Sequence, residues 1–136
     1  MIRKIDHTAD AGFEITAPTQ KELFVEAAYA MLDILYDRTT VDEEKSRTIK
    51  ISASEVDILL HDFLSEILQI AQYELFLVSR ISLKEIDDRH IEAEIFGEKF
   101  NPEKHEFFSE IKAITYHQLT AEPRGKNWFG RVIVDI

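Results

Sequence analysis

The most strongly patterned segment of the chain is residues 54–71, SEVDILLHDFLSEILQIA, and it limits the folds that the chain can adopt. Ser54 is typical of a helix N-cap, and Glu55 and Asp57 follow in the first turn, where the helix dipole favours negative charge. Apolar residues then recur with helical spacing over a wide face, which Ile70 widens further. These residues are Val56, Leu59, Leu60, Phe63, Leu64, Ile67, Leu68 and Ala71. A helix that is apolar over so much of its circumference is expected to be covered on more than one side.

Another helix is expected over Thr19–Leu35. Thr19 stands three residues before Glu22, which is the spacing of a capping box at a helix N-terminus. The apolar residues that follow again draw one wide face. They are Leu23, Phe24, Ala27, Ala28, Met31, Leu32 and Leu35.

The remaining segments alternate polar and apolar residues, as half-buried strands do. Four of the expected strands are Thr48–Ser52, Phe76–Ile86, Ile111–Ala121 and Trp128–Ile136. A fifth follows the turn after Ile86, carries Ile91, Ala93 and Ile95 on one face, and ends at Gly97. Residues 37–46 are polar and predict a surface connection, and residues 123–127 predict a hairpin turn. Two helices cannot cover both faces of a large antiparallel sheet. The sequence therefore predicts an α+β fold in a single domain, residues 1–136, with the helices as a middle layer.

The composition of the chain excludes several classes of protein. Its 136 residues suit one compact domain, and 16 Lys and Arg against 26 Asp and Glu give a formal net charge of −10. That balance argues against direct binding to a nucleic-acid phosphate backbone, although residues 111–136 carry a slight positive excess that could equally be chance. The absence of cysteine excludes a disulfide framework, a thiolate zinc site and a thiol nucleophile. Without a membrane-length apolar run or a signal peptide, the chain is expected to be cytoplasmic.

Residues 6–10, DHTAD, form a compact polar segment that no capping pattern requires. Asp6 and Asp10 offer hard oxygen ligands, and His7 between them offers an imidazole. The alternative interpretation is a solvated turn held by an Asx-type hydrogen bond.

Asp135 is the second unusual carboxylate. It follows the apolar run 132–134, VIV, and only Ile136 with its α-carboxylate comes after it. A carboxylate in an apolar strand is costly unless it is paired or bound to a cation. Together with an aspartate of residues 6–10, these two carboxylates could form a cage suited to Ca²⁺ or Mg²⁺. The alternative is an exposed chain end.

The run 111–117, IKAITYH, carries three further candidates. In a strand, Lys112 and Tyr116 share one face and His117 lies on the other. A lone histidine on a strand more often makes structural hydrogen bonds than acts as a catalyst.

The five histidines of the chain show no zinc-binding spacing, and neither a phosphate-binding glycine loop nor a nucleophile elbow is present. The chain lacks a complete active-site pattern, which favours a binding or helper protein over an enzyme.

Four segments, read in order, resemble the archease family. They are residues 6–12 (DHTADAG), 97–98 (GE), 111–117 (IKAITYH) and 132–136 (VIVDI). Residues 23–28, LFVEAA, also look like the family, so the resemblance spans essentially the whole chain. Ala11 departs from the pattern, where a larger aliphatic residue is expected, and residues 37–46 match nothing in it.

The resemblance implies a three-layer β/α/β sandwich with two main helices between two sheets, and an accessory protein rather than an enzyme. It implies a factor that activates an RtcB-type tRNA-splicing RNA ligase by promoting guanylylation of the ligase and its multiple turnover. It also implies a divalent metal, with Ca²⁺ expected, on Asp10, Asp135 and Ile136. The chemistry of the residues and the resemblance select the same carboxylates.

The surface expected to meet the partner lies around that acidic cluster. It comprises Asp6, His7, Lys112, Tyr116 and His117. Two other functions stay open from the sequence. One is a general chaperone or modulator of tRNA-modifying enzymes, for which the resemblance implies a tRNA methyltransferase as a partner, and the other is a small metal-dependent hydrolase with His7 as its base. Direct strong binding to nucleic acid or to a membrane is not expected.

Overall fold

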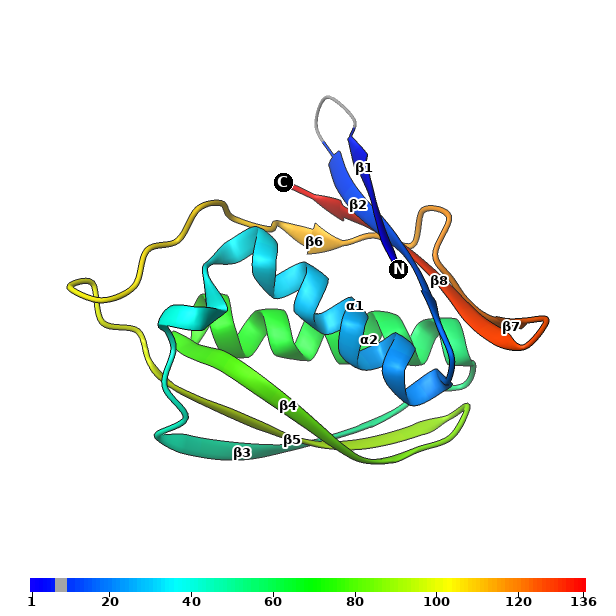
Figure 1. Cartoon of the computed structure of the whole chain (residues 1–136), viewed down its shortest axis with the longest axis horizontal. Coiled ribbons are helices and arrows are strands. Elements are labelled where there is room, and N and C mark those ends of the chain that lie inside the picture. The colour runs from blue at the N-terminus through cyan, green and yellow to red at the C-terminus, as the bar shows by residue number, and fades with distance from the viewer. Residues whose placement is uncertain (7–9) are drawn as a thin grey trace.

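Two helices lie between two antiparallel sheets in the computed structural model, which describes residues 1–6 and 10–136 without the side chains of Ile5 and Asp6 (Figure 1). The helices are α1 (Gln20–Leu35) and α2 (Val56–Leu68), with a 3-10 turn at Arg38–Thr40 and a π-helical turn at Gln69–Tyr73. The strands are β1 (Ile2–Asp6), β2 (Asp10–Ala17), β3 (Lys45–Ser52), β4 (Phe76–Ile86), β5 (His90–Lys99), β6 (Ala113–Ile114), β7 (Thr120–Arg124) and β8 (Asn127–Asp135). The predicted three-layer α+β fold is confirmed.

The strand order brings the N-terminal hairpin and the C-terminal strand into one sheet. The five-stranded sheet has the order β1-β2-β8-β6, and β7 also pairs with β8. The other sheet has the order β3-β5-β4, with β5 in the centre. Strand β8 pairs with β2 from Trp128 to Asp135, so the C-terminus lies beside the β1–β2 hairpin (Figure 1).

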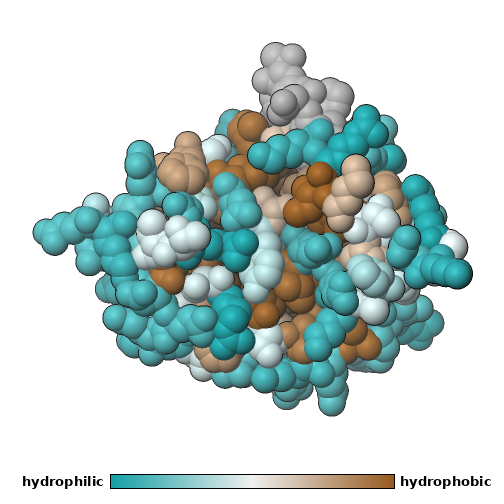
Figure 2. Space-filling view, viewed as in Figure 1, coloured by the Kyte–Doolittle hydropathy of each residue, from teal (hydrophilic) through white to brown (hydrophobic). Residues whose placement is uncertain are grey.

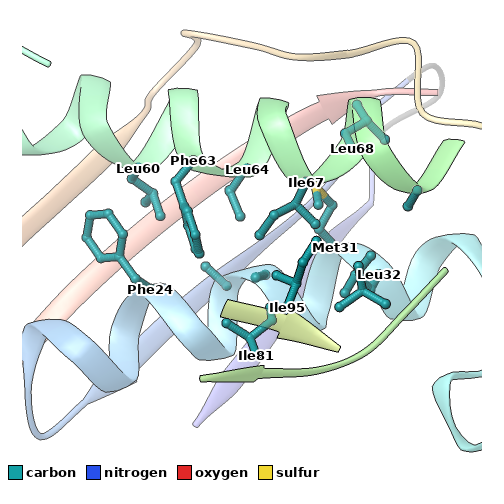
Figure 3. Close-up of a cluster of buried hydrophobic side chains, with 14 of the residues drawn as sticks. Phe24, Met31, Leu32, Leu60, Phe63, Leu64, Ile67, Leu68, Ile81 and Ile95 are labelled. Atoms are coloured by element: carbon teal, nitrogen blue, oxygen red, sulfur yellow. The ribbon is translucent and has the colours of Figure 1, made fainter. Parts of the chain in front are cut away.

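The core fills the space between the two helices and both sheets. Large side chains of α2 point toward α1 and toward the three-stranded sheet (Figure 3). Phe24 of α1 and Phe63 of α2 lie with their ring centroids 6.0 Å apart. Ile81 of β4 and Ile95 of β5 close the cluster from the sheet side. Helix α2 therefore has cover on more than one side, as its wide apolar face predicts.

The N-termini of the helices agree only in part with the predicted caps. Thr19 Oγ1 accepts a hydrogen bond from the Glu22 backbone N–H at 3.1 Å, and α1 begins at Gln20 as expected. The prediction of Ser54 as the N-cap of α2 is wrong, because Glu55 holds that position. The Asp57 carboxylate accepts the Ile58 N–H at 2.8 Å and so satisfies a first-turn donor that a capping serine would otherwise serve.

The predicted strand Ile111–Ala121 is wrong, because this run forms the short strand β6 and then, after a turn, the strand β7. Gln118 has the left-handed φ of 52°, which ends an extended conformation. The Leu119 N–H closes the turn on the Tyr116 carbonyl at 3.3 Å. The hairpin turn between β7 and β8 is confirmed, with Gly125 at φ +60°.

The outer surfaces of the molecule are mainly polar. Figure 2 shows that hydrophilic surface covers most of the face seen in Figure 1, and that hydrophobic surface appears in separate patches, in the middle of the face and toward its upper and lower edges. On the three-stranded sheet, Lys50 pairs with Glu92 and Lys84 with Glu94 across neighbouring strands. None of the helices among residues 1–6 and 10–136 is long and apolar enough to cross a membrane.

Candidate functional site

The pairing of β2 with β8 places Asp10 directly opposite Asp135. Both residues are half-buried. Residues opposite each other in antiparallel strands project from the same face of the sheet, and like charges in that arrangement destabilise it. A bound cation would relieve the repulsion between these two carboxylates.

The donor set fits a hard divalent cation. Two carboxylates face each other, and Ile136, with its α-carboxylate, follows Asp135 directly. Oxygen ligands of this kind suit Ca²⁺ and, with bound water, Mg²⁺. In the part of the chain that the structure describes, no group of three or more His, Cys, Asp or Glu side chains could hold a metal ion. A complete site therefore needs a donor besides these side chains, and the resemblance described above implies the α-carboxylate of Ile136 for that place.

The two remaining candidates of the N-terminal segment are only partly described. Asp6 pairs with Ala11 in the β1–β2 register, and its side chain is outside the part of the chain that the structure describes. His7 lies outside the described residues altogether.

Lys112 lies on the other side of Asp135. Its backbone N–H donates to the Asp135 carbonyl at 2.7 Å, and the next residue, Ala113, stands opposite Asp135 in the β6–β8 register. The Lys112 side chain is exposed. Three segments thus converge: β2 with Asp10, β8 with Asp135 and the start of β6 with Lys112.

Tyr116 and His117 lie in the turn after β6, so the predicted strand alternation does not apply to them. The backbone N–H of His117 donates to Thr115 Oγ1 at 3.2 Å, and the His117 side chain is exposed. Tyr116 is 62% exposed and stacks on the His61 ring, with centroids 4.0 Å apart and an interplanar angle of 17°. The segment that carries Lys112 therefore ends in an aromatic side chain held against α2.

His61 is a functional candidate that the sequence analysis missed. Its Nδ1 lies 2.8 Å from Asp62 Oδ1, and its Nε2 lies 2.9 Å from the Ile114 carbonyl oxygen. Both ring nitrogens face acceptors, so both bonds form at once only when the ring carries two protons. His61 thereby ties α2 to β6.

The Gly97–Glu98 motif belongs to a buried ionic cluster. Glu98 Oε2 accepts hydrogen bonds from the Asp42 N–H at 2.6 Å, from Lys104 Nζ at 2.6 Å and from His105 Nε2 at 3.2 Å. Burial alone raises the pKa of Glu98, but these hydrogen bonds outweigh it and bring the pKa below its ordinary value. The Asn101 N–H donates to His105 Nδ1 at 3.0 Å, which makes His105 a neutral imidazole that donates through Nε2. The cluster fastens the loop after β5.

Glu98→Gln is expected to lower the free energy of unfolding by about 1–3 kcal/mol at neutral pH, because the neutral amide loses the negative charge that strengthens the hydrogen bonds from Lys104, His105 and the Asp42 N–H. A carboxyl group whose pKa is lower in the folded state stabilises the fold above its unfolded pKa, and this contribution is lost as the pH falls through the folded pKa. The difference between variant and wild type should therefore shrink below about pH 4.5, the ordinary pKa of a glutamate. Urea unfolding at a series of pH values measures it.

The exposed Glu103 of the same loop provides the control. Glu103→Gln should leave the free energy of unfolding nearly unchanged at every pH. A Glu98→Gln deficit that is independent of pH would contradict the ionic role of Glu98.

The fold and the site together define a class of small three-layer β/α/β protein in which an aspartate of the N-terminal hairpin faces an aspartate at the end of the last strand. The sequence matches the profile of the Archease protein family over residues 3–136. The chain belongs to this family.

Relatives cover nearly the whole chain. It is 34% identical to protein archease of Methanopyrus kandleri over 136 residues, spanning 98% of this chain and 97% of the relative. It is 35% identical to protein archease of Methanosarcina mazei, spanning 97% and 93%. A solution structure of a Methanobacterium thermoautotrophicum protein has a TM-score of 0.82 at 29% identity, covering 99% of this chain and 98% of that one. A crystal structure of a Thermotoga maritima archease, described as a possible chaperone, has a TM-score of 0.68 at 26% identity, covering 98% and 96%.

Proposed function

We propose that this archease is an accessory protein that activates an RtcB-type tRNA-splicing RNA ligase, promoting guanylylation of the ligase and its multiple turnover. The observation that best supports the proposal is the cross-strand pair of Asp10 and Asp135, with Lys112 bonded to the same strand end. The chain acts through this partner and does not itself turn over a substrate.

Asp10, Asp135 and the α-carboxylate of Ile136 are the residues that would hold a divalent cation, for which Ca²⁺ is the candidate. When bound, the ion supplies positive charge at a surface that is otherwise acidic. The two aspartates face each other across β2 and β8, so the strand register sets their spacing. The chain's part is to orient these oxygens and to hold them at a surface that a partner can reach.

Lys112, Tyr116 and His117 supply the neighbouring contacts. All three are exposed, and they lie on one short segment, residues 112–117, whose first residue is hydrogen-bonded to Asp135. The backbone N–H of Lys112 is bonded to the Asp135 carbonyl, and its exposed ammonium group can contact a phosphate of the partner's nucleotide. The net charge of −10 favours docking to a basic, RNA-binding protein over direct binding to RNA.

RNA ligation with substrate in excess over an RtcB-type ligase tests the proposal. Adding this protein and Ca²⁺ should raise the yield from a single turnover to many and should accelerate ligase guanylylation. Guanylylation is followed separately with labelled GTP, so an effect on that step is distinguished from protection of the ligase. No change in either step, with the ligase from the same organism, would overturn the proposal.

A second candidate function is a chaperone or modulator for a tRNA-modifying enzyme such as a tRNA methyltransferase. A pocket of about 270 Å³ lies between the β1–β2 hairpin and α1, and its lining includes the apolar residues Ile2, Phe13, Ala30 and Ile34. Such a surface suits an exposed apolar side chain of a client. A protein with this function would suppress aggregation of its client whether or not Asp135 is present. Ligase activation, in contrast, is expected to require Asp135, so this difference separates the two functions.

A further inference from the structure

The segment that carries Lys112 is bonded on both of its edges. On one side Ala113 and Ile114 pair with β8, and the flanking Lys112 and Thr115 N–H groups donate to the Asp135 and Ile133 carbonyls of the same strand. On the other side its partner is a side chain: Gln72 Nε2 donates to the Ile111 carbonyl at 2.8 Å, and Gln72 Oε1 accepts from the Ile111 N–H at 2.9 Å. The amide of Gln72 thus occupies the place that a neighbouring strand's backbone would take in a longer sheet.

Gln72 belongs to the π-helical turn Gln69–Tyr73 that continues α2. It follows Leu64 and Leu68 at intervals of four residues, which is where a further apolar residue would continue their stripe. Ile70 and Ala71 are buried beside it, whereas Gln72 is half-buried. A polar group in such surroundings is costly unless it is hydrogen-bonded, and Ile111 satisfies both ends of the amide.

His61, like Gln72, bonds to the edge of residues 111–114 that faces α2. Its Nε2 lies 2.9 Å from the carbonyl oxygen of Ile114, which follows Ile111 in the same segment. Lys112 lies between the two fastened residues, and its N–H bonds to the Asp135 carbonyl at 2.7 Å. Gln72 and His61 therefore hold the stretch that brings Lys112 to Asp135.

We propose that Gln72 is a positioning residue of the candidate site, which with His61 fixes residues 111–114 so that Lys112 lies beside Asp135. The proposal rests on the proposed function, in which Lys112 meets the partner. Gln72 itself touches neither partner nor metal. It acts through the backbone of Ile111.

The isosteric substitution Gln72→Glu tests the proposal. At neutral pH the new carboxylate has no donor for the Ile111 carbonyl and repels it. The lost bond leaves the Ile111 carbonyl unpaired, so the segment should open more often. Hydrogen-exchange protection of the Ile111 and Lys112 amides should therefore fall roughly tenfold or more. Ligase stimulation should fall with it.

The pH profile of the variant separates positioning from general damage to the fold. A protonated carboxyl group offers one hydrogen-bond donor and one acceptor, as the amide does, because its O–H can donate to the Ile111 carbonyl while its C=O accepts the Ile111 N–H. Protection of both amides, compared with wild type at the same pH, should therefore return as the pH falls through the titration of the introduced carboxyl. Damage to α2 would not recover in this way.

Gln69→Glu is the matched control, since it introduces the same charge at an exposed position of the same π-turn. It should behave like wild type in exchange and in ligation. Unchanged protection at Ile111 in Gln72→Glu would overturn the proposal, as would lost protection with wild-type ligase stimulation. If the wild-type protein itself fails to stimulate the ligase, the proposed function fails, and the exchange profile still tests whether Gln72 holds the Lys112 segment.

Discussion

Asp135→Asn is expected to abolish ligase stimulation, returning the reaction to a single turnover. The amide has nearly the size of the carboxylate, so the strand pairing of β8 with β2 and β6 is retained. The charge that a cation requires is removed, and a neutral amide oxygen is a weaker ligand for Ca²⁺ than a carboxylate. Multiple-turnover ligation with labelled RNA measures the effect, and Asp10→Asn should reproduce it because the two residues face each other.

Stability supplies an independent test of the same variant. Without metal, Asp135→Asn should raise the free energy of unfolding by about 0.2–1 kcal/mol, because it removes a like-charge pair from opposite positions of two strands. Added Ca²⁺ should raise the thermal midpoint of the wild type and leave that of the variant unchanged, because a ligand stabilises only the folded state that binds it. Glu122→Gln removes an exposed carboxylate of β7 that pairs with Arg124 at 3.1 Å, so it is the control for the metal response: its thermal midpoint should rise with Ca²⁺ as much as that of the wild type. Full stimulation by folded Asp10→Asn and Asp135→Asn would exclude the carboxylate pair from the function.

The layer arrangement could be predicted because helix periodicity reports burial directly. Residues 54–71 are apolar on too much of their circumference for a surface helix, and α2 indeed contacts α1 and both sheets. The boundaries were less predictable. The sequence predicts Ser54 as the N-cap of α2, whereas the first-turn N–H of Ile58 is bonded to the side chain of Asp57, and either residue type can satisfy such an N–H.

The break between β6 and β7 could not be predicted from alternation alone. Ile111 and Ile114 are both buried although they lie three positions apart, so they cannot share one face of a regular strand. The run 111–121 looks alternating because single polar residues separate many of its apolar ones. The left-handed turn at Gln118 uses a residue type that carries no strong turn signal.

The carboxylates of the candidate site could be selected from their chemistry, but their proximity could not. Asp10 meets Asp135 only because β2 and β8 pair in one register. His61 and Gln72 were missed for a different reason. Their partners are backbone carbonyl and amide groups 53 and 39 residues away along the chain, and such groups have no signature in a side-chain pattern.

Gly97→Ala is expected to cost about 4 kcal/mol or more of unfolding free energy, a large share of what a domain of this size possesses. A Cβ atom at Gly97 would lie 1.7 Å from the Leu77 carbonyl oxygen and 2.8 Å from the Leu77 carbonyl carbon. These are backbone atoms of the neighbouring strand, so no side-chain rotation can relieve the overlap. Strand β5 is the central strand of its sheet, and moving it would disturb its pairing with β3 and β4 together. Urea unfolding followed by circular dichroism measures the loss.

Gly125 is the appropriate comparison because its requirement is conformational rather than steric. It has φ +60°, and a Cβ atom at this position would meet no other atom within 4 Å. Gly125→Asn should therefore cost at most about 1 kcal/mol, since asparagine tolerates the left-handed region.

The close approach at Gly97 also seats the next residue, Glu98, against the Asp42 N–H, Lys104 and His105. Any folded Gly97→Ala protein should therefore lose the pH dependence attributed to Glu98, because a displaced β5 backbone carries that carboxylate away from its donors. A Gly97→Ala protein with wild-type stability would show that β4 and β5 do not approach as closely as the structure indicates.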